Sequence, residues 1–476
     1  MGDTIDREIE ISQQRAFKVE WTDGEGLQRL VDVPRTVYPP REDSTLLHRA
    51  LLQLQGPPGR LLEIGCGTGV ISHSMAKIGW EVVAIDPNPF AVACTRSLKG
   101  VEMRVLEGAL EEGAHLKHGV FDVIAWNPPY LEPIEERLGP MEEAALTRPK
   151  VHPIVHVIEH LKENDCLAKD GCIIIIASDD APTRQALSYA DREGWCSRRI
   201  AGHSRGGERL AAVCIWRPWR YEPIIITETE STMDELPADS KCGDLVIADI
   251  QTSGRGRRGN NWIGVKGDFF GTWCIIGPEK NDLSTHDLHM ISVIAVLEAL
   301  QTFTGHGIDR IGWCPQSDIG VRWPNDLVRG EGAVKCGGLL LNARTCGDDV
   351  RVHLGIGLNG SNRTITHDWR LDRDTTTELG HVPIDIVHPS IIEGDLKGLD
   401  EHVHRALAGW FMKHTRVPMP DLEAMRRTWW AASRTTRVIS EERRRTDKSY
   451  IIAVRLDENG LHGWDGWNIR EIYNII

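Results

Sequence analysis

An arginine- and glycine-rich stretch in the second half of the chain has the residues for chemistry on an anion: Gln251-Thr-Ser-Gly-Arg-Gly-Arg-Arg-Gly-Asn-Asn-Trp262. Three arginines and three glycines fall between Gly254 and Gly259. Glycine lets a loop move, and the planar guanidinium of arginine matches carboxylate and phosphate oxygens. The stretch therefore predicts a loop that closes over an anionic ligand. The alternative is an exposed basic turn, or an arginine–glycine patch on nucleic acid.

A rigid turn in the first half has the residues for chemistry on nitrogen. Asn127-Pro128-Pro129-Tyr130 follows the apolar run Phe121–Trp126. The two prolines lack backbone donors and fix φ, so they hold the Asn127 amide and the Pro128 carbonyl outward. Such a pair can receive both hydrogens of a planar NH2 group while the Tyr130 ring packs against it. A turn that merely ends a strand would need neither the asparagine nor the tyrosine.

Three glycines and an acid precede this turn. Gly65, Gly67 and Gly69 lie where an apolar strand is followed by a helix, which lets the backbone approach a nucleotide-like ligand closely. Asp86 ends the next strand, where a carboxylate can accept hydrogen bonds from ribose hydroxyls. Tight strand-to-helix turns also use glycine for packing alone. The GxGxG spacing favours S-adenosylmethionine over a dinucleotide.

Alternating strands and helices must position these residues. We expect a small hairpin over residues 11–35 and helices near 70–78, from about 90, and over 154–167. We expect strands at 60–64, 81–85, 103–106, 121–126, 172–177 and 208–216. This alternation predicts an α/β domain, a parallel sheet with helices on both faces.

The glycine turn and the Asn-Pro-Pro-Tyr turn together resemble class I methyltransferases that act on planar nitrogens, either adenine N6 or a glutamine amide. Val37-Tyr-Pro-Pro-Arg-Glu-Asp-Ser-Thr-Leu46 further resembles HemK-type release-factor glutamine methyltransferases, with residues 36–217 covered. The resemblance implies a Rossmann-like fold, a release factor as substrate and a small activating subunit as partner. It assigns to the S-adenosylmethionine site Glu63, Gly65, Gly67, Gly69 and Asp86, with Glu42, Asp43 and Ser44 near the methionine end.

Two departures from that pattern keep a second hypothesis open. Gly108-Ala109-Leu110 stands where the family usually has an acid, and Thr147–Val151 stands where its branch has a glycine-rich segment. The first change affects the adenine end of the cofactor site, and the second affects the substrate side. A domain without turnover that serves as a docking surface is therefore the alternative.

Five motifs in order make residues 221–476 resemble the catalytic domain of biotin protein ligases. They are the arginine loop, Thr229–Asp234, Val321–Leu327, Lys335–Gly338 and Gly355–Asn359. The resemblance implies an α+β biotin/lipoate ligase fold, adenylation of biotin by ATP with Mg²⁺, and transfer to a lysine of a carboxylase biotin carrier protein. Lipoate ligation is the nearest competitor, and lipoate ligases generally lack the arginine run.

The resemblance also assigns roles within this domain. Because the biotin carboxylate and the α-phosphate of ATP repel each other, positive charge must shield both, and Arg255, Arg257 and Lys335 supply it. Asp326 would orient the acceptor lysine. The ligand-binding positions are Ser231, Thr232, Met233, Gln251, Gly254, Gly256, Arg258, Trp262, Asn325, Gly338 and Asn359. Met233 replaces a usual asparagine and Asn260 a common basic residue.

Composition limits the remaining classes. The chain has 476 residues, a formal net charge of −14 and eleven scattered cysteines without a CxxC pair. These features indicate a cytoplasmic protein with reduced thiols and no broad nucleic-acid affinity. No membrane span, no operator-binding helix-turn-helix and no metal site in the Cys/His pattern is expected. The predicted domains are residues 1–217, 224–430 and 431–476, the last a small SH3-like β-barrel.

Overall fold

The structure is a computed structural model of the whole chain. It describes residues 14–129, 151–205, 208–256, 261–262, 264, 266–278, 283–303, 319–322, 324–329, 334–347, 349–360, 396–413, 416–418, 422–432, 437–438, 451–457, 460–464 and 469–472. Among these residues, no helix combines the length and apolar character that crossing a bilayer requires.

The chain divides into two compact units. The first contains Met1–Arg217 together with Lys413–Met419, and the second contains Pro218–Met412 and Pro420–Ile476. The first unit is therefore built from two separate stretches of sequence. The domain boundaries predicted from the sequence did not include this second stretch, Lys413–Met419, in the first domain.

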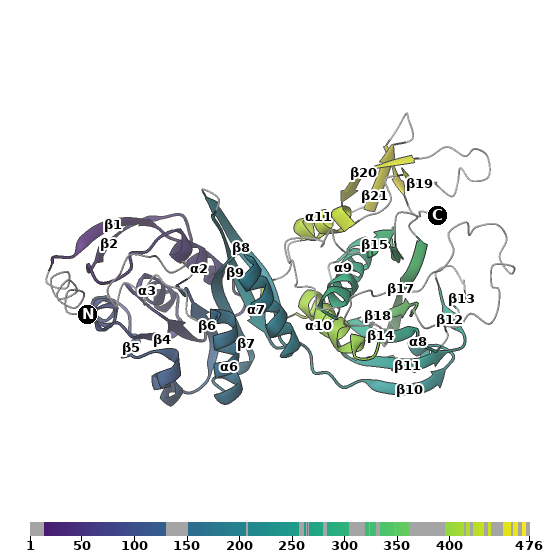
Figure 1. Cartoon of the computed structure of the whole chain (residues 1–476), viewed down its shortest axis with the longest axis horizontal. Coiled ribbons are helices and arrows are strands. Elements are labelled where there is room, and N and C mark those ends of the chain that lie inside the picture. The colour runs from purple at the N-terminus through teal and green to yellow at the C-terminus, as the bar shows by residue number, and fades with distance from the viewer. Residues whose placement is uncertain are drawn as a thin grey trace. The chain divides into compact units, whose positions relative to one another are not determined.

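A seven-stranded sheet with the order β5-β4-β3-β6-β7-β9-β8 forms the first unit (Figure 1). Five of its strands are parallel: β3 (Arg60–Ile64), β4 (Glu81–Asp86), β5 (Arg104–Glu107), β6 (Phe121–Trp126) and β7 (Leu167–Ser178). The expectation of a wholly parallel sheet is wrong for β9 (Glu208–Trp216), which runs antiparallel to both of its neighbours, β7 and β8 (Cys196–Arg205). Arg205 pairs with Glu208, so two residues join these strands, too few for a parallel crossover.

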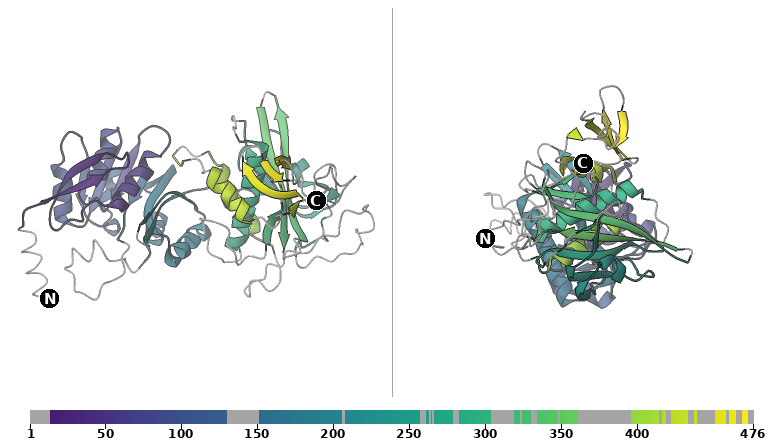
Figure 2. Two further views of the ribbon diagram at one scale, coloured as in Figure 1. Left: turned by 90° about the horizontal axis from the view of Figure 1, so that it is seen from above. Right: turned by 90° about the vertical axis from the view of Figure 1, so that its right-hand side faces the viewer.

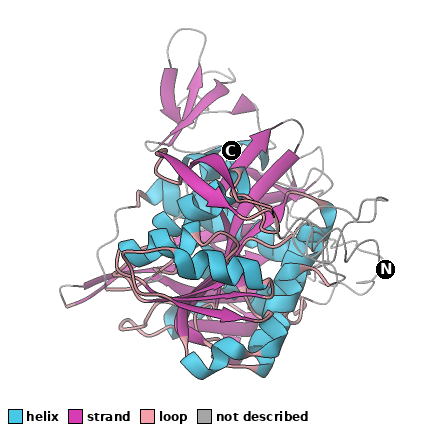
Figure 3. Ribbon diagram, turned by 90° about the vertical axis from the view of Figure 1, so that its left-hand side faces the viewer, coloured by secondary structure: helices cyan, strands magenta, loops and turns pink. Residues whose placement is uncertain are grey.

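Helices cover both faces of this sheet, as expected; Figure 3 shows them in cyan beside the strands. They are α2 (Glu42–Leu52), α3 (Val70–Lys77), α4 (Pro89–Ser97), α6 (Pro153–Glu163) and α7 (Ala181–Arg192), with short 3-10 helices η1 (Leu110–Glu112) and η2 (Ala114–His118). Successive side chains of a strand point to opposite faces. Val83 and Ile85 accordingly join the core beneath α6 and α7, whereas Ala84 packs with Val92 of α4.

Two predicted boundaries in this unit move. The helix expected to reach residue 167 ends at Glu163, because Asn164 has extended backbone angles. The strand expected at residue 172 begins at Leu167, because Phe121 N–H donates to the Cys166 carbonyl and extends the pairing of β6 with β7. The predicted N-terminal hairpin is confirmed as β1 (Phe17–Thr22) and β2 (Gln28–Val33).

The second unit contains another seven-stranded sheet, with the order β10-β11-β14-β18-β17-β16-β15. Its strands are β10 (Ile224–Thr229), β11 (Leu245–Gln251), β14 (Phe269–Ile276), β15 (Ile319–Arg322), β16 (Asp326–Arg329), β17 (Val334–Cys346) and β18 (Asp349–Leu358). β10 and β11 are parallel and joined through the short helix α8 (Thr232–Glu235), and the other pairs are antiparallel. A separate two-stranded ribbon joins β12 (Gly254–Arg255) and β13 (Asn261–Trp262).

One long helix, α9 (Thr285–Phe303), forms the centre of this unit's core. Most of its residues are buried, and a helix that is apolar on all sides belongs inside a domain. It packs with the sheet and with α10 (Leu399–Phe411) and α11 (Leu422–Ala432).

Four antiparallel strands close the described chain: β19 (Arg437–Val438), β20 (Ile451–Asp457), β21 (Gly460–Trp464) and β22 (Ile469–Ile472). They are the yellow strands of Figures 1 and 2. The short strands expected here are present as a small sheet, and the SH3-like barrel stays a prediction.

Candidate functional site

The three glycines after β3 differ in what surrounds them. All three have positive φ, between 53° and 75°. A Cβ atom on Gly69 would lie 2.6 Å from the Thr95 hydroxyl, so Gly69 serves close packing against α4. A Cβ on Gly65 or Gly67 would meet no atom closer than 3.8 Å. Gly65 and Gly67 thus border open space at the carboxyl end of β3, where backbone can approach a ligand.

Asp86, at the carboxyl end of β4, faces the same turn. Its two carboxylate oxygens accept hydrogen bonds from Gly67 N–H at 2.9 Å and Asn88 N–H at 2.8 Å. Burial raises the pKa of Asp86, and the two backbone donors oppose that rise. Since each carboxylate oxygen has a second lone pair, both can still accept from ligand hydroxyls.

Glu63 lies on the strand below the turn and is almost fully buried. Burial raises its pKa to about 8, although the Ser72 hydroxyl donates to its carboxylate. At neutral pH the buried side chain is therefore mostly protonated and adds little negative charge beside Asp86. Its burial and its hydrogen bond with Ser72 are those of a residue that stabilises the turn.

The Asn-Pro-Pro turn comes to this place because β6 pairs with β3. Trp126, the last residue of β6, has its indole nitrogen 3.8 Å from the position of a Gly65 Cβ. The next residue, Asn127, has a buried Oδ1 atom with no hydrogen-bond partner among the described residues. An orphaned buried acceptor is costly unless a ligand completes it. Pro128 and Pro129 follow, and Tyr130 lies outside the described residues.

The segment before α2 borders the turn as well. The Tyr38 carbonyl is 4.0 Å from a Gly67 Cβ position. Glu42 begins α2, and the next two residues, Asp43 and Ser44, are buried in its first turn. The Asp43 carboxylate accepts from Ser44 N–H at 2.6 Å and from the Ser44 hydroxyl at 3.2 Å. The structure thus brings the predicted nucleotide and acceptor residues of the first unit to one end of its sheet.

In the second unit, the arginine loop begins and ends in the β12–β13 ribbon. Gly254 pairs with Trp262, and Arg255 pairs with Asn261. The Arg255 guanidinium donates to Asp234 at 2.6 Å, and both side chains are about half exposed. Gly256 is exposed to an intermediate degree, whereas Arg257 and Arg258 lie outside the described residues.

A lysine, a carboxylate and an indole meet beside this ribbon. Lys335 Nζ lies 2.7 Å from Asp326 Oδ1 and 5.3 Å from the centre of the Trp262 ring. These elements converge because β16, which starts at Asp326, pairs with β17, which carries Lys335. The ammonium is mostly shielded from water and lies over an aromatic face, an arrangement that holds a cation in place.

Two glycines make room for that indole. A Cβ on Gly338 would lie 3.1 Å from the Trp262 ring and 3.3 Å from Lys335 Nζ. A Cβ on Gly357 would lie 2.8 Å from the same ring. The absence of side chains at both positions sets the place of Trp262, and thereby the distance between the indole and Lys335.

A polar group of buried side chains lies where β10 and β11 end. Gln251 Oε1 accepts from Thr232 N–H at 3.0 Å and from the Thr232 hydroxyl at 3.2 Å, and Thr232 contacts Thr272 at 2.8 Å. Ser231 is buried, and its hydroxyl has no partner among the described residues. Met233 is buried with its sulfur 3.1 Å from a Gly355 Cβ position. An orphaned hydroxyl beside an ordered amide suits a small polar ligand.

The two predicted amides adjoin strands of the same sheet: Asn325 immediately precedes β16, and Asn359 immediately follows β18. Asn325 is buried, donates its side-chain N–H to the Leu339 carbonyl at 2.5 Å and accepts Leu339 N–H through its own carbonyl. Asn359 is fully buried and donates its N–H to the Cys336 carbonyl at 2.9 Å. Both residues are fixed by hydrogen bonds to β17, the strand that contains Lys335 and Gly338.

Some residues of this site were missed from sequence. Gly357 and Gly355 belong to a quoted motif, but their part in seating Trp262 and Met233 depends on the pairing of β17 with β18. Arg344 donates to the Met233 carbonyl and lies 3.5 Å from Asp234. It is far along the chain from both, and a lone arginine in a strand gives no signal of such a contact.

Family comparison matches each unit separately. Residues 224–359 match the model of the biotin/lipoate A/B protein ligase family, and residues 40–186 match the model of a methyltransferase domain.

Individual relatives agree with this division. The chain is 41% identical over 104 residues to a protein of Methanocaldococcus jannaschii named as an N5-glutamine methyltransferase, covering 21% of this chain and 50% of that protein. It is 33% identical over 115 residues to biotin–[acetyl-CoA-carboxylase] ligase of Paracoccus denitrificans, covering 24% of this chain and 43% of that protein. The chain thus spans half or less of these relatives. A solved biotin protein ligase from Aquifex aeolicus aligns with 54% of this chain and 97% of that one, at 21% identity and a TM-score of 0.37.

Proposed function

We propose that this chain, which joins a methyltransferase domain to a domain of the biotin/lipoate A/B protein ligase family, is a cytoplasmic enzyme with two activities. Its second unit would attach biotin to a carboxylase carrier protein. Its first unit would methylate a planar nitrogen with S-adenosylmethionine. Each activity is argued from its own site.

The cluster of Lys335, Asp326 and Trp262 supports the ligase activity most directly. In the first step a carboxylate oxygen of biotin attacks the α-phosphorus of ATP, a new P–O bond forms, and pyrophosphate leaves. Lys335 is held where its charge can shield both anions as they approach. Asp326 already binds this ammonium, so we assign Mg²⁺ to the phosphate oxygens of ATP.

The second step needs an acceptor amine close to Asp326. The carrier lysine attacks the carbonyl carbon of biotinyl-5′-AMP, the amide bond forms, and AMP leaves while the amine loses its proton. The Asp326 carboxylate can accept a hydrogen bond from that amine once Lys335 has turned toward the phosphate. The arginine loop, entered through Arg255, would close over the intermediate and exclude water.

The polar group at Ser231, Thr232 and Gln251 supports biotin as the acid. Biotin's ureido ring presents two N–H donors and one carbonyl acceptor, and the orphaned Ser231 hydroxyl can satisfy one of them. Lipoate has no such polar ring and would leave this hydroxyl unsatisfied. The discriminating assay is carrier labelling with biotin and lipoate in competition. Pyrophosphate release with lipoate but not with biotin would refute the biotin assignment.

The buried Oδ1 atom of Asn127 supports methyl transfer by the first unit. The amide oxygen and the neighbouring Pro128 carbonyl could hold both hydrogens of a planar NH2 group, and S-adenosylmethionine would supply the methyl group. The open backbone at Gly65 and Gly67 and the Asp86 carboxylate fit that cofactor. The acceptor nitrogen would form one N–C bond to the methyl group as the S–C bond of S-adenosylmethionine breaks, and it would release one proton to solvent.

A glutamine amide of a release factor is the acceptor we propose, with a small activating subunit as partner. The relative from Methanocaldococcus jannaschii favours an amide over adenine N6. Calorimetry with S-adenosylmethionine, followed by mass spectrometry of a release factor incubated with the chain, tests this. Cofactor binding with a methylated glutamine supports the proposal. No binding would favour the docking-module hypothesis, and methylated adenine in nucleic acid would refute the amide.

A further inference from the structure

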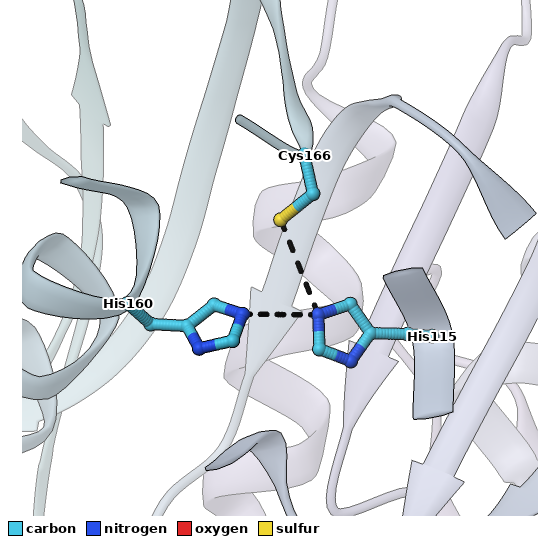
Figure 4. Close-up of side chains that lie close together, drawn as sticks. All are labelled: His115, His160 and Cys166. Carbon is cyan, nitrogen blue, oxygen red and sulfur yellow. Dashed lines mark hydrogen bonds between the residues drawn. The ribbon is translucent and has the colours of Figure 1, made fainter. Parts of the chain in front are cut away.

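Two histidines and a cysteine converge in the core of the first unit, away from its proposed cofactor site. His115 comes from η2, His160 from α6, and Cys166 precedes β7 (Figure 4). The two Nε2 atoms are 3.1 Å apart, and Cys166 Sγ is 4.0 Å from His115 Nε2. All three ligand atoms lie within 4.8 Å of one another, and all three residues are buried.

The position of this cluster separates it from methyl transfer. Cys166 immediately precedes Leu167, which pairs with Phe121 at the amino end of β6. The His115 ring also contacts Phe121, with ring centres 6.4 Å apart. Asn127 follows the carboxyl end of that same strand. The cluster therefore lies at the opposite end of β6 from the cofactor turn.

Imidazole nitrogen and thiolate sulfur are the ligands that Zn²⁺ prefers. Bond lengths of about 2.0–2.1 Å to nitrogen and about 2.3 Å to sulfur place tetrahedral ligand atoms roughly 3.3–3.6 Å apart. The contacts of 3.1 and 4.0 Å bracket that separation. Side-chain movements on the order of 1 Å would bring the three atoms onto one ion.

A hydrogen bond between two histidines accounts for only part of this arrangement. It satisfies one nitrogen of each ring, and the Cys166 thiol adds only a long contact of 4.0 Å to the same His115 nitrogen. Polar groups placed together in an apolar core are costly unless they are compensated.

We propose that His115, His160 and Cys166 form a zinc site that ties η2 to α6 and to the start of β7. Water would fill the fourth position of the tetrahedron. Cys166 binds as the thiolate and releases its proton to solvent, and the oxidation state of zinc does not change. The role is structural, because the ion would join η2 to α6 and the start of β7, which follow it at a separation of 45 and 51 residues for the ligands concerned.

Metal analysis of the full chain, purified without a histidine tag, tests the site directly. We expect about one zinc per chain, lost on dialysis against a strong chelator and restored by Zn²⁺ alone. Cobalt substitution should give a thiolate-to-cobalt charge-transfer band with four-coordinate visible absorption. A parent protein that binds no stoichiometric zinc after incubation with Zn²⁺ would overturn the proposal.

Matched variants locate the ion. Cys166→Ser and His160→Gln should weaken zinc binding at least about a hundredfold, since loss even of groups that only orient a ligand costs 10–100-fold. His156→Gln is the control, because His156 lies one turn earlier on α6 and pairs with Glu111 at 3.2 Å instead. It should keep both the zinc and the cobalt band. Zinc retained by Cys166→Ser, or lost from His156→Gln, would contradict the assigned ligands. The measurements on the parent protein stand even where a variant fails to fold.

Discussion

Substituting Gly357 by alanine tests how the second unit positions its tryptophan. The added Cβ would lie 2.8 Å from Cε2, 2.9 Å from Nε1 and 3.0 Å from Cζ2 of Trp262. Ordinary carbon contacts are about 3.5–4.0 Å, so the ring must retreat by roughly 0.5–1 Å. Gly357 pairs with Phe270 on one side and Gly338 on the other, which holds its strand in place. The two-residue strand that contains Trp262 is therefore the part that yields.

Overpacking of this kind costs about 1–3 kcal/mol, which is about one to two decades in binding. The resemblance to biotin protein ligases implies that Trp262 lies beside the adenylate, so we expect the loss to appear in the KM for ATP. The KM for biotin should change much less. Pyrophosphate release, measured while ATP and biotin are varied separately, gives both values.

Two further variants make this test decisive. Gly409→Ala in α10 is the control, because its Cβ would meet no atom within 4 Å and alanine favours a helix. Trp262→Phe removes the part of the ring that the Gly357→Ala methyl would strike. The ATP penalty of Gly357→Ala should therefore shrink by about 1 kcal/mol in the Trp262→Phe background. An unchanged KM for ATP in the folded Gly357→Ala protein, or strictly additive effects, would refute the proposed contact.

Three other perturbations give distinct results. The pKa of Glu63 is about 8 in the folded protein against an ordinary 4.5, so its contribution to stability is complete below about pH 4.5 and is lost as pH rises through 8. The free energy of unfolding of Glu63→Gln should therefore depend less on pH than that of the parent protein. An equally steep dependence would exclude Glu63 as the source of the pH dependence. Asn127→Ala should lower kcat/KM for methyl transfer by about one to two decades, because the lost hydrogen bond is worth ~1–3 kcal/mol. The affinity for S-adenosylmethionine, measured by calorimetry, should stay within about twofold of that of the parent protein. An equal loss of cofactor binding would contradict a role on the acceptor side. Arg257→Gly should still form biotinyl-5′-AMP but bind this intermediate more weakly by roughly 1.5–3 kcal/mol. The released intermediate should then label bystander proteins. Complete loss of pyrophosphate release would instead assign Arg257 to the first step.

Strand and helix periodicity predicted most of the first unit, because each buried strand is a continuous apolar run between clear turns. β8 was not predicted, since Cys196–Arg205 alternates poorly and contains two adjacent arginines. Its pairing with β9 supplies the order that its own pattern lacks. The end of α6 was misplaced for a related reason. Cys166 continues an apolar pattern that suits a helix, but its carbonyl is taken by the backbone of β6.

The candidate site residues were predictable where each of them directly follows or ends a clear strand. Gly65, Gly67 and Asp86 meet because parallel strands end at one edge of a sheet. Contacts that depend on pairing across the second sheet were not predictable, as the seating of Trp262 by Gly357 illustrates. The cluster of His115, His160 and Cys166 was also missed. Its residues have no ligand spacing in sequence, and only the fold brings η2, α6 and β7 together.

The return of the chain at Lys413–Met419 bears on how the protein is made. The Arg416 carbonyl accepts Gln55 N–H at 3.0 Å, its guanidinium lies 3.5 Å from Asp122 and 5.2 Å from the Trp80 ring centre, and the Pro418 carbonyl accepts from Arg198 at 2.5 Å. A ribosome that has finished Arg217 must add roughly two hundred residues before this segment emerges, which takes about 10–40 s at ~5–20 residues per second. Throughout that interval the first unit remains attached to the ribosome without Lys413–Met419. Gene fragments that end at Arg217 would leave it in that state permanently.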